Sequence, residues 1–157
     1  WSRHEHIDRY EGDRVLSPES DEFWEVQRRD LIATAERLTD RGETLVIVLT
    51  ERPGIGMLSR PSAEMNSMLV QYSIDHDEYR QRFNQIVTEV AAQRDDIRTI
   101  DGDSLFCGDA PGVGLGPLCD DTVDGNVMRP DGNHVDNDLF GAQVAEQLLD
   151  KMRAVVS

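Results

Sequence analysis

Five consecutive apolar residues, Leu45 to Leu49, constrain the fold of this chain more than any other stretch. The run is short and rich in β-branched residues, which is typical of a strand covered on both faces. Such strands belong to parallel sheets, whose neighbouring strands are joined by crossover helices. Ile97 to Ile100 predicts a second strand. The loop at 51–61, after the first strand, would lie at the sheet edge where ligands bind in open α/β folds.

Helical patterns alternate with these strands. The first is expected to begin at a capping serine, Ser17 or Ser20, and to end at Gly42. Its apolar stripe is Phe23, Val26 or Gln27, Leu31, Ala35 and Leu38. Two further helices are predicted over residues 63–72 and from about residue 75 to residue 94.

The alternation of strand and helix predicts one α/β domain over residues 1–157, with a three-layer α/β/α architecture and a parallel sheet. A chain of 157 residues has the length of one domain and can bury a core. No internal repeat or low-complexity stretch interrupts it. Both ends of the sheet are expected to be incomplete.

Acidic residues outnumber basic ones by 31 to 16, which gives a formal net charge of −15. They are spread along the chain, which predicts a solvated acidic surface rather than an acidic tail. This charge opposes electrostatic binding to nucleic acids and to anionic membranes. No apolar run is long enough to span a membrane and no signal sequence stands at Trp1, so any export signal or anchor is expected outside this stretch.

Two side chains with useful chemistry, Asp131 and His134, lie in a polar turn before the last predicted helix. Pro130 favours a tight turn at Asp131-Gly132-Asn133-His134. An aspartate three residues before a histidine can accept the Nδ1 proton of the imidazole, which leaves Nε2 free as a general base. The pair is therefore predicted to be the base half of a serine-hydrolase triad. The alternative is that Asp131 only forms the turn and His134 is an exposed polar residue.

The helix after this turn is predicted to be amphipathic. Its apolar residues recur every three or four positions, at Leu139, Phe140, Val144, Leu148, Met152 and Val155. We expect this face to be buried and to anchor the turn at the N-terminus of the helix.

The stretch VDGNVMRPDGNH, from Val123 to His134, and the alanine-bearing helix after it resemble the last conserved block of SGNH (GDSL-type) hydrolases. With Leu105-Phe106-Cys107 and Leu118-Cys119, the resemblance is closest to the SGNH domains fused to membrane-bound acyltransferases of bacterial envelopes. It covers the second half of the chain and, more loosely, residues 45–50. It implies a flavodoxin-like SGNH fold, an extracytoplasmic location, an acylated carbohydrate substrate, no cofactor, and a membrane acyltransferase domain as a fused or neighbouring partner.

In that family the nucleophilic serine lies in a G-D-S block near the start of the domain. No such block precedes Leu45, so the resemblance implies that this chain is the C-terminal portion and that the serine and oxyanion hole lie upstream. Gly102-Asp103-Ser104-Leu105 lies 30 residues before His134, where the family has an ordinary strand end, and we interpret it as a strand-to-loop turn. The opening Trp1-Ser2 resembles the tryptophan after the family's third block, which implies that Trp1 and Arg3 line the acyl pocket.

The only two cysteines, Cys107 and Cys119, bracket a loop rich in glycine and proline. A disulfide between them would close this loop and contribute about 2–3 kcal/mol in the chain-entropy model. Two free buried cysteines are the alternative. The spacing fits neither C-x-x-C redox chemistry nor a paired zinc site. The predicted disulfide indicates an oxidising compartment.

A competing pattern at the N-terminus is His4-Glu5-His6-Ile7-Asp8, which resembles the H-x-H-x-D motif of metallo-β-lactamase-like hydrolases. His4, His6 and Asp8 would then bind zinc. Arg9 stands where that family has another histidine, and no strand precedes the motif, so we expect no metal.

Two non-hydrolytic alternatives stay open. Asp120, Asp124 and Gly125 partly match a calcium-binding EF-hand loop, although no glutamate closes it at the twelfth position. An acidic extracellular binding domain could also keep the D-x-x-H turn for structure alone. The favoured hypothesis is a serine esterase or O-acyltransferase acting on acyl esters of envelope carbohydrate, with Asp131 and His134 as the base pair and the serine supplied from outside the sequence.

Overall fold

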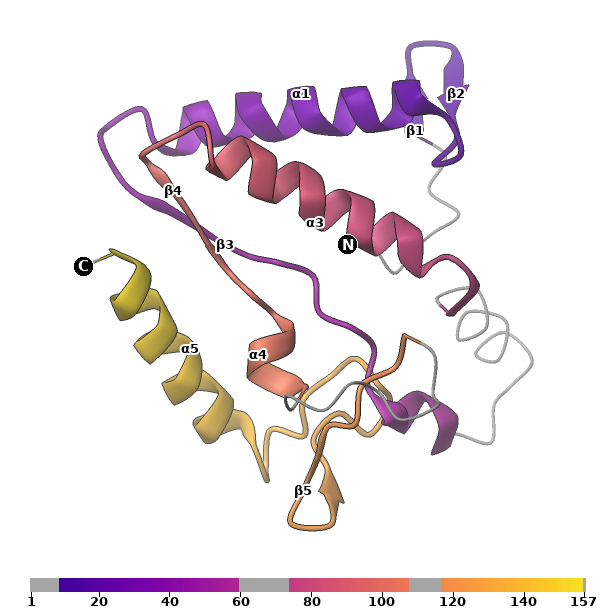
Figure 1. Ribbon diagram of the computed structural model, residues 1–157, viewed down its shortest axis with the longest axis vertical. Coiled ribbons are helices and arrows are strands. Elements are labelled where there is room, and N and C mark those ends of the chain that lie inside the picture. The colour runs from indigo at the N-terminus through magenta and orange to yellow at the C-terminus, as the bar shows by residue number, and fades with distance from the viewer. Residues whose placement is uncertain (1–8, 60–73, 108–116, 157) are drawn as a thin grey trace. The chain divides into compact units, whose positions relative to one another are not determined.

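The computed structural model describes residues 9–59, 74–107 and 117–156 (Figure 1). These residues fall into two compact units. The first contains residues 9–47 and 78–99, and the second contains the rest. The helix expected over residues 63–72 lies outside the described residues. The single domain expected for residues 1–157 stays a prediction.

The first unit opens with a short antiparallel hairpin of β1 (Arg9–Glu11) and β2 (Arg14–Leu16). Helix α1 (Asp21–Leu38) follows, and Ser20 caps it by accepting the backbone N–H of Phe23 on its side chain at 3.3 Å. Ser20 was one of the two predicted caps. The helix ends at Leu38, with Thr39 as its C-cap, rather than at Gly42, and the backbone N–H and the hydroxyl of Thr39 both donate to the carbonyl of Ala35 at 3.0 Å.

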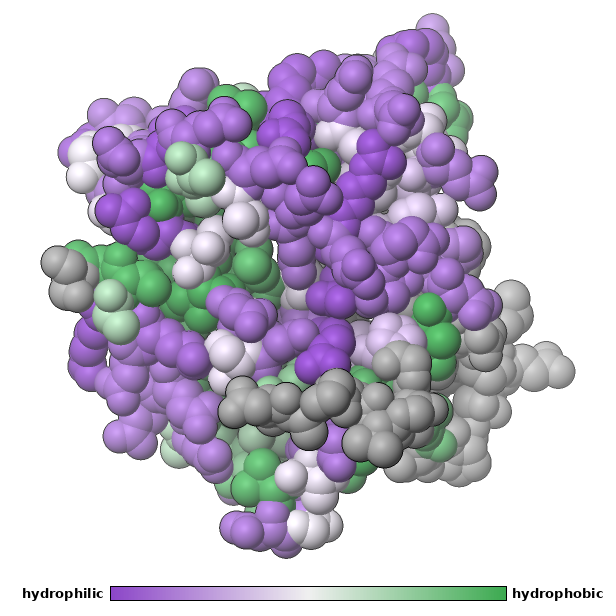
Figure 2. Space-filling model, in the orientation of Figure 1, coloured by the Kyte–Doolittle hydropathy of each residue, from purple (hydrophilic) through white to green (hydrophobic). Residues whose placement is uncertain are grey.

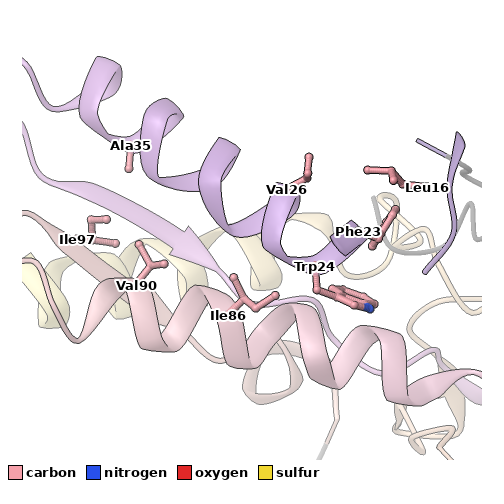
Figure 3. Close-up of a cluster of buried hydrophobic side chains, with 8 residues drawn as sticks. All are labelled: Leu16, Phe23, Trp24, Val26, Ala35, Ile86, Val90 and Ile97. Carbon is pink, nitrogen blue, oxygen red and sulfur yellow. The ribbon is translucent and has the colours of Figure 1, made fainter. Parts of the chain in front are cut away.

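Helix α3 (Asp77–Ala91) packs against α1 through the core of the first unit (Figure 3). The buried cluster consists of Leu16, Phe23, Trp24, Val26, Ala35, Ile86, Val90 and Ile97. Most of the predicted α1 stripe is confirmed, but Leu38 is exposed. Trp24, which the stripe omitted, is buried edge-on against Phe23 with ring centroids 5.0 Å apart. Its indole N–H donates to the carbonyl of Pro18 at 2.7 Å.

Strands β3 (Leu45–Val48) and β4 (Ile97–Ile100) form a short parallel sheet, as predicted. The Leu45 N–H donates to Asp96 O and the Leu49 N–H to Ile100 O, so both strands advance in the same direction. The protein is therefore an α/β protein. The expectation that β3 is covered on both faces is wrong, since the side chain of Val48 is 41% exposed and the rest of the strand is half-buried. A sheet of two strands within the described residues leaves each strand with an open edge.

The second unit contains the 3₁₀ helix η1 (Ile55–Ser59), the single-turn helix α4 (Asp103–Phe106), a hairpin of β5 (Thr122–Val123) and β6 (Asn126–Val127), and helix α5 (Gly141–Val156). The predicted burial of the apolar face of α5 is confirmed only in part, since Val144, Leu148 and Val155 are half-buried while Leu139 and Met152 are exposed. No residue of α5 is buried, although Phe140 just before it is. Helix α4, which contacts α5, is too short to cover its sixteen residues.

Hydrophilic residues cover most of the face shown in Figure 2, in keeping with the net charge of −15. Within the three described ranges, no helix combines the length and the hydropathy needed to cross a membrane.

Candidate active site

The turn that carries Asp131 is closed by a hydrogen bond from the Gly132 N–H to the carbonyl of Arg129, at 2.7 Å. Pro130 occupies the second position of this turn and Gly132, with φ of +79°, the fourth, which are the positions that proline and glycine prefer. A second bond, from the Asp136 N–H to Met128 O at 2.9 Å, closes the base of the loop. The backbone turn thus lies at 129–132, two positions before the predicted 131–134, where the Asp131 side chain accepts the backbone N–H groups of Asn133 and His134 instead.

Within this loop, Asp131 and His134 are in direct contact. Oδ2 of Asp131 lies 2.7 Å from Nδ1 of His134. Oδ1 of the same carboxylate accepts the backbone N–H groups of Asn133 at 2.9 Å and of His134 at 2.7 Å. With its proton on Nδ1, the imidazole donates to Asp131 and keeps the lone pair of Nε2 free to act as a base.

The two members of the pair differ in exposure. The side chain of Asp131 is 18% exposed, whereas that of His134 is 86% exposed. Burial alone would raise the pKa of the Asp131 carboxyl, but hydrogen bonds from the backbone N–H and imidazole of His134 and from the N–H of Asn133 lower that pKa to about 2. Asp131 is therefore ionised at neutral pH and can hold a protonated imidazole.

The loop after β3 packs directly against this turn. The Gly54 N–H donates to the carbonyl of Gly132 at 2.9 Å. A Cβ on Gly132 would lie 2.0 Å from Cγ of Met57, and a Cβ on Gly56 would lie 2.0 Å from the carbonyl oxygen of Arg129. A side chain at Gly56 would therefore collide with the backbone of the turn, and one at Gly132, where φ is also +79°, would collide with the Met57 side chain. The loop predicted at the ligand-binding edge of the sheet is thus in contact with the D-x-x-H turn.

Arg129 is the first residue of the turn at 129–132, and its side chain is completely buried. Its Nε donates to Oδ2 of Asp121 at 2.9 Å, its Nη1 to the carbonyl of Arg52 at 2.9 Å, and its Nη2 to Sγ of Cys119 at 3.0 Å. The guanidinium also lies over the ring of Phe106, 4.8 Å from the centroid. Sequence reasoning missed this residue, because nothing in the local pattern distinguishes a buried arginine from an exposed one.

Cys107 and Cys119 form the predicted disulfide. It links the end of α4 to the segment before β5. The backbone of Cys119 is in turn bonded to the loop after β3, since its N–H donates to Pro53 O at 2.9 Å and its carbonyl accepts the Ile55 N–H at 3.0 Å. The disulfide and the D-x-x-H turn are therefore attached to the same loop.

No match was found when the chain was compared with models of known families, with curated proteins and with solved structures.

Ser104, in the G-D-S-L tetrapeptide, lies in the first turn of α4 and donates its hydroxyl proton to Asp101 O at 2.5 Å. The preceding Asp103 accepts hydrogen bonds from the backbone N–H of Arg52 at 2.6 Å and from its Nε at 2.7 Å. These contacts agree with the interpretation that the tetrapeptide connects a strand to the next element. It begins a helical turn rather than a loop.

The segment proposed as a calcium loop is a β-hairpin. Asp124 and Gly125 occupy its two-residue turn, with φ of +50° and +80°. An Asp-Gly pair between short strands favours this turn type, and that signal was present in the sequence. An EF-hand places its loop between two helices, so the calcium interpretation is wrong.

The remaining predicted site residues, Trp1, Arg3, His4, His6 and Asp8, lie outside the described residues. The acyl-pocket and zinc hypotheses built on them stay predictions. Within the described part of the chain, no three histidine, cysteine, aspartate or glutamate side chains group as a metal site.

A pocket of about 320 Å³ lies between α1 and α3 in the first unit. Ion pairs between its own lining residues, Arg82 with Asp21 and Arg28 with Glu89, involve four of its five charged side chains. It contains none of the predicted site residues.

Proposed function

We propose that this chain is part of a flavodoxin-like SGNH hydrolase domain that acts as a serine esterase or O-acyltransferase, with Asp131 and His134 as its base pair. The observation that carries the proposal is the contact of 2.7 Å between Oδ2 of Asp131 and Nδ1 of His134. Support comes from the lowered pKa of Asp131, about 2, since an ionised carboxylate is what the imidazolium of a triad needs.

In the proposed mechanism a serine from outside this sequence attacks the carbonyl carbon of an acyl ester. Nε2 of His134 takes the serine proton, and Asp131 stabilises the imidazolium that forms. The imidazolium then gives its proton to the departing sugar oxygen, which leaves an acyl-serine. Water or an acceptor hydroxyl, deprotonated by His134, then attacks the acyl carbon, and the bond to the serine oxygen breaks as the imidazolium returns its proton to the serine. The 86% exposure of the His134 side chain supports this scheme, because Nε2 is open to a group from another segment.

Several features support the wider setting. The short parallel sheet of β3 and β4 is compatible with the SGNH architecture. The disulfide favours an oxidising compartment, and so an extracytoplasmic location. The acylated envelope carbohydrate as substrate, and the membrane acyltransferase domain as a fused or neighbouring partner, rest on the resemblance carried by Val123 to His134.

Two aspartates in the same loop provide a matched test. The Asp136 side chain accepts the backbone N–H groups of Asp138 at 3.1 Å and of Leu139 at 3.3 Å. Asp131 makes the same two bonds, to the N–H groups two and three residues after it. Only Asp131 also contacts an imidazole. In the complete protein, Asp131→Asn should keep the turn and lower kcat for an O-acetylated sugar by roughly 10⁴-fold, because the amide favours the wrong tautomer of the imidazole. Asp136→Asn should keep its activity. Equal activity of the two variants would make Asp131 a turn former, as in a non-catalytic binding domain.

A further inference from the structure

Arg129 is the largest fully buried side chain among the described residues, and it is charged. Its partner Asp121 is also completely buried, and Glu51 approaches Nη1 at 3.6 Å. Removing two charges from water costs several kcal/mol per ion, and their attraction repays this only with good geometry and further hydrogen bonds. A buried ion pair is therefore weak evidence for a purely stabilising role.

The bonding of Asp121 is incomplete. Oδ2 accepts from Arg129, but Oδ1 is buried without a hydrogen-bond partner. Such an unpartnered oxygen is destabilising, and a well-packed apolar pair of similar volume is often neutral or stabilising in its place. Gly54 contributes to the arrangement, since a Cβ there would lie 2.3 Å from Oδ2 of Asp121. The Asp121 carboxylate therefore fits beside residue 54 only because that residue is glycine.

The network attaches the first residue of the turn at 129–132 to two other segments of the chain, at Arg52 and at residues 119–121. The Arg129 side chain bonds to Arg52 O, to Asp121 and to Cys119, while its own carbonyl closes the turn through Gly132. The neighbouring Met128 N–H donates to the carbonyl of Asp121 at 2.9 Å. Residue 129 is thus fixed through its side chain and its backbone, two positions before Asp131.

We propose, resting on the function proposed above, that Arg129 is a positioning residue for the reaction, with Asp121 as its partner. The buried pair fixes the start of the turn at 129–132, so that the Asp131 carboxylate meets Nδ1 of His134 and leaves Nε2 directed towards the serine. Arg129 touches neither the imidazole nor the substrate, and it acts through Asp131.

The test removes both charges together, because removing one would leave the other buried and unpaired. The variant is Arg129→Met/Asp121→Leu in the complete protein. Its matched control is Arg94→Met/Asp96→Leu, which removes an ion pair of 2.6 Å in the first unit. Three quantities are measured: the melting temperature, kcat and KM for an O-acetylated sugar, and the pKa of the Asp131 carboxyl by NMR titration.

We expect the Arg129 double variant to stay folded and to lose on the order of 10²-fold in kcat with little change in KM, as small misplacements of catalytic groups do. The pKa of Asp131 should rise from about 2 towards its ordinary 3.8, because the donors in the turn are no longer aligned. The Arg94 double variant should leave kcat and this pKa unchanged. Arg129→Lys keeps the positive charge and Asp121, but it should lose kcat as the double variant does. The ammonium lacks the planar guanidinium that bonds to three acceptors at once.

A folded double variant with wild-type kcat and an Asp131 pKa still near 2 would overturn the proposal. If the double variant does not fold, kcat and the Asp131 pKa are measured in Arg129→Lys instead, and wild-type values of both would overturn the proposal. Should the wild-type protein hydrolyse no ester while the pKa of Asp131 still rises in the double variant, the esterase function fails and the positioning role of Arg129 stands.

Discussion

Oδ2 of Asp131 lies 2.7 Å from Nδ1 of His134, while Oδ1 accepts the backbone N–H groups of Asn133 and His134. One carboxylate therefore builds the turn and orients the imidazole. Both tasks depend on the same backbone geometry, so a change that distorts the turn should also disturb the base.

Gly132 and Gly125 offer a direct test of how tightly the turn is constrained. Their φ angles are +79° and +80°, but a Cβ on Gly125 would meet nothing within 4 Å, whereas one on Gly132 would lie 2.0 Å from Met57 Cγ. Gly125→Ala should cost about 1–2 kcal/mol in the free energy of unfolding, from backbone strain alone. Gly132→Ala should cost about 1–3 kcal/mol more, from overpacking, and should abolish ester turnover. Equal losses of unfolding free energy in urea would contradict the close approach.

The pKa of Asp131 predicts a specific dependence of stability on pH. Its folded pKa of about 2 lies below the ordinary 3.8, so the ionised carboxylate stabilises the fold fully above pH 3.8 and this contribution is lost as the pH falls through 2. The contribution is about 2 kcal/mol. The difference in unfolding free energy between wild type and Asp131→Asn should therefore shrink between pH 5 and pH 2. A difference independent of pH, measured by urea unfolding, would show that the turn does not depend on the charge.

The disulfide between Cys107 and Cys119 should contribute about 3 kcal/mol to stability, because it closes a loop in the unfolded chain. Cys107→Ser/Cys119→Ser should lower the free energy of unfolding by this amount. A reducing agent should destabilise the wild type and leave the variant unchanged. In protein taken from its native compartment, alkylation without reductant should modify neither cysteine, and free thiols there would argue against an extracytoplasmic location.

The sequence predicted those strands, helix caps and turns that depend on residues close together in the chain. The apolar run at Leu45 predicted β3, Ser20 was one of two candidate caps, and a turn beside Pro130 followed from the preferences of proline and glycine, although it lies two positions before its predicted place. The pairing of Asp131 with His134 has the same origin, since the two residues are only three positions apart in the sequence.

The buried network around Arg129 could not be predicted in this way. Its partners Arg52 and Cys119 are 77 and 10 residues away in sequence, and arginine is almost never fully buried unless it is paired. The exposure of Leu139 and Met152, on the apolar face at and just before α5, was missed for a related reason. An amphipathic pattern predicts which face of a helix prefers burial, but not whether a neighbouring element is long enough to cover it.

Labelling with a fluorophosphonate probe tests the central claim most directly, because the probe reacts with a serine only where a base activates it. We predict that the complete protein is labelled at a serine outside this sequence and that residues 1–157 alone are not labelled. His134→Ala should slow labelling of the complete protein by several orders of magnitude, whereas Ser104→Ala should not change it. Labelling of Ser104, or a labelling rate that does not depend on His134, would contradict the account.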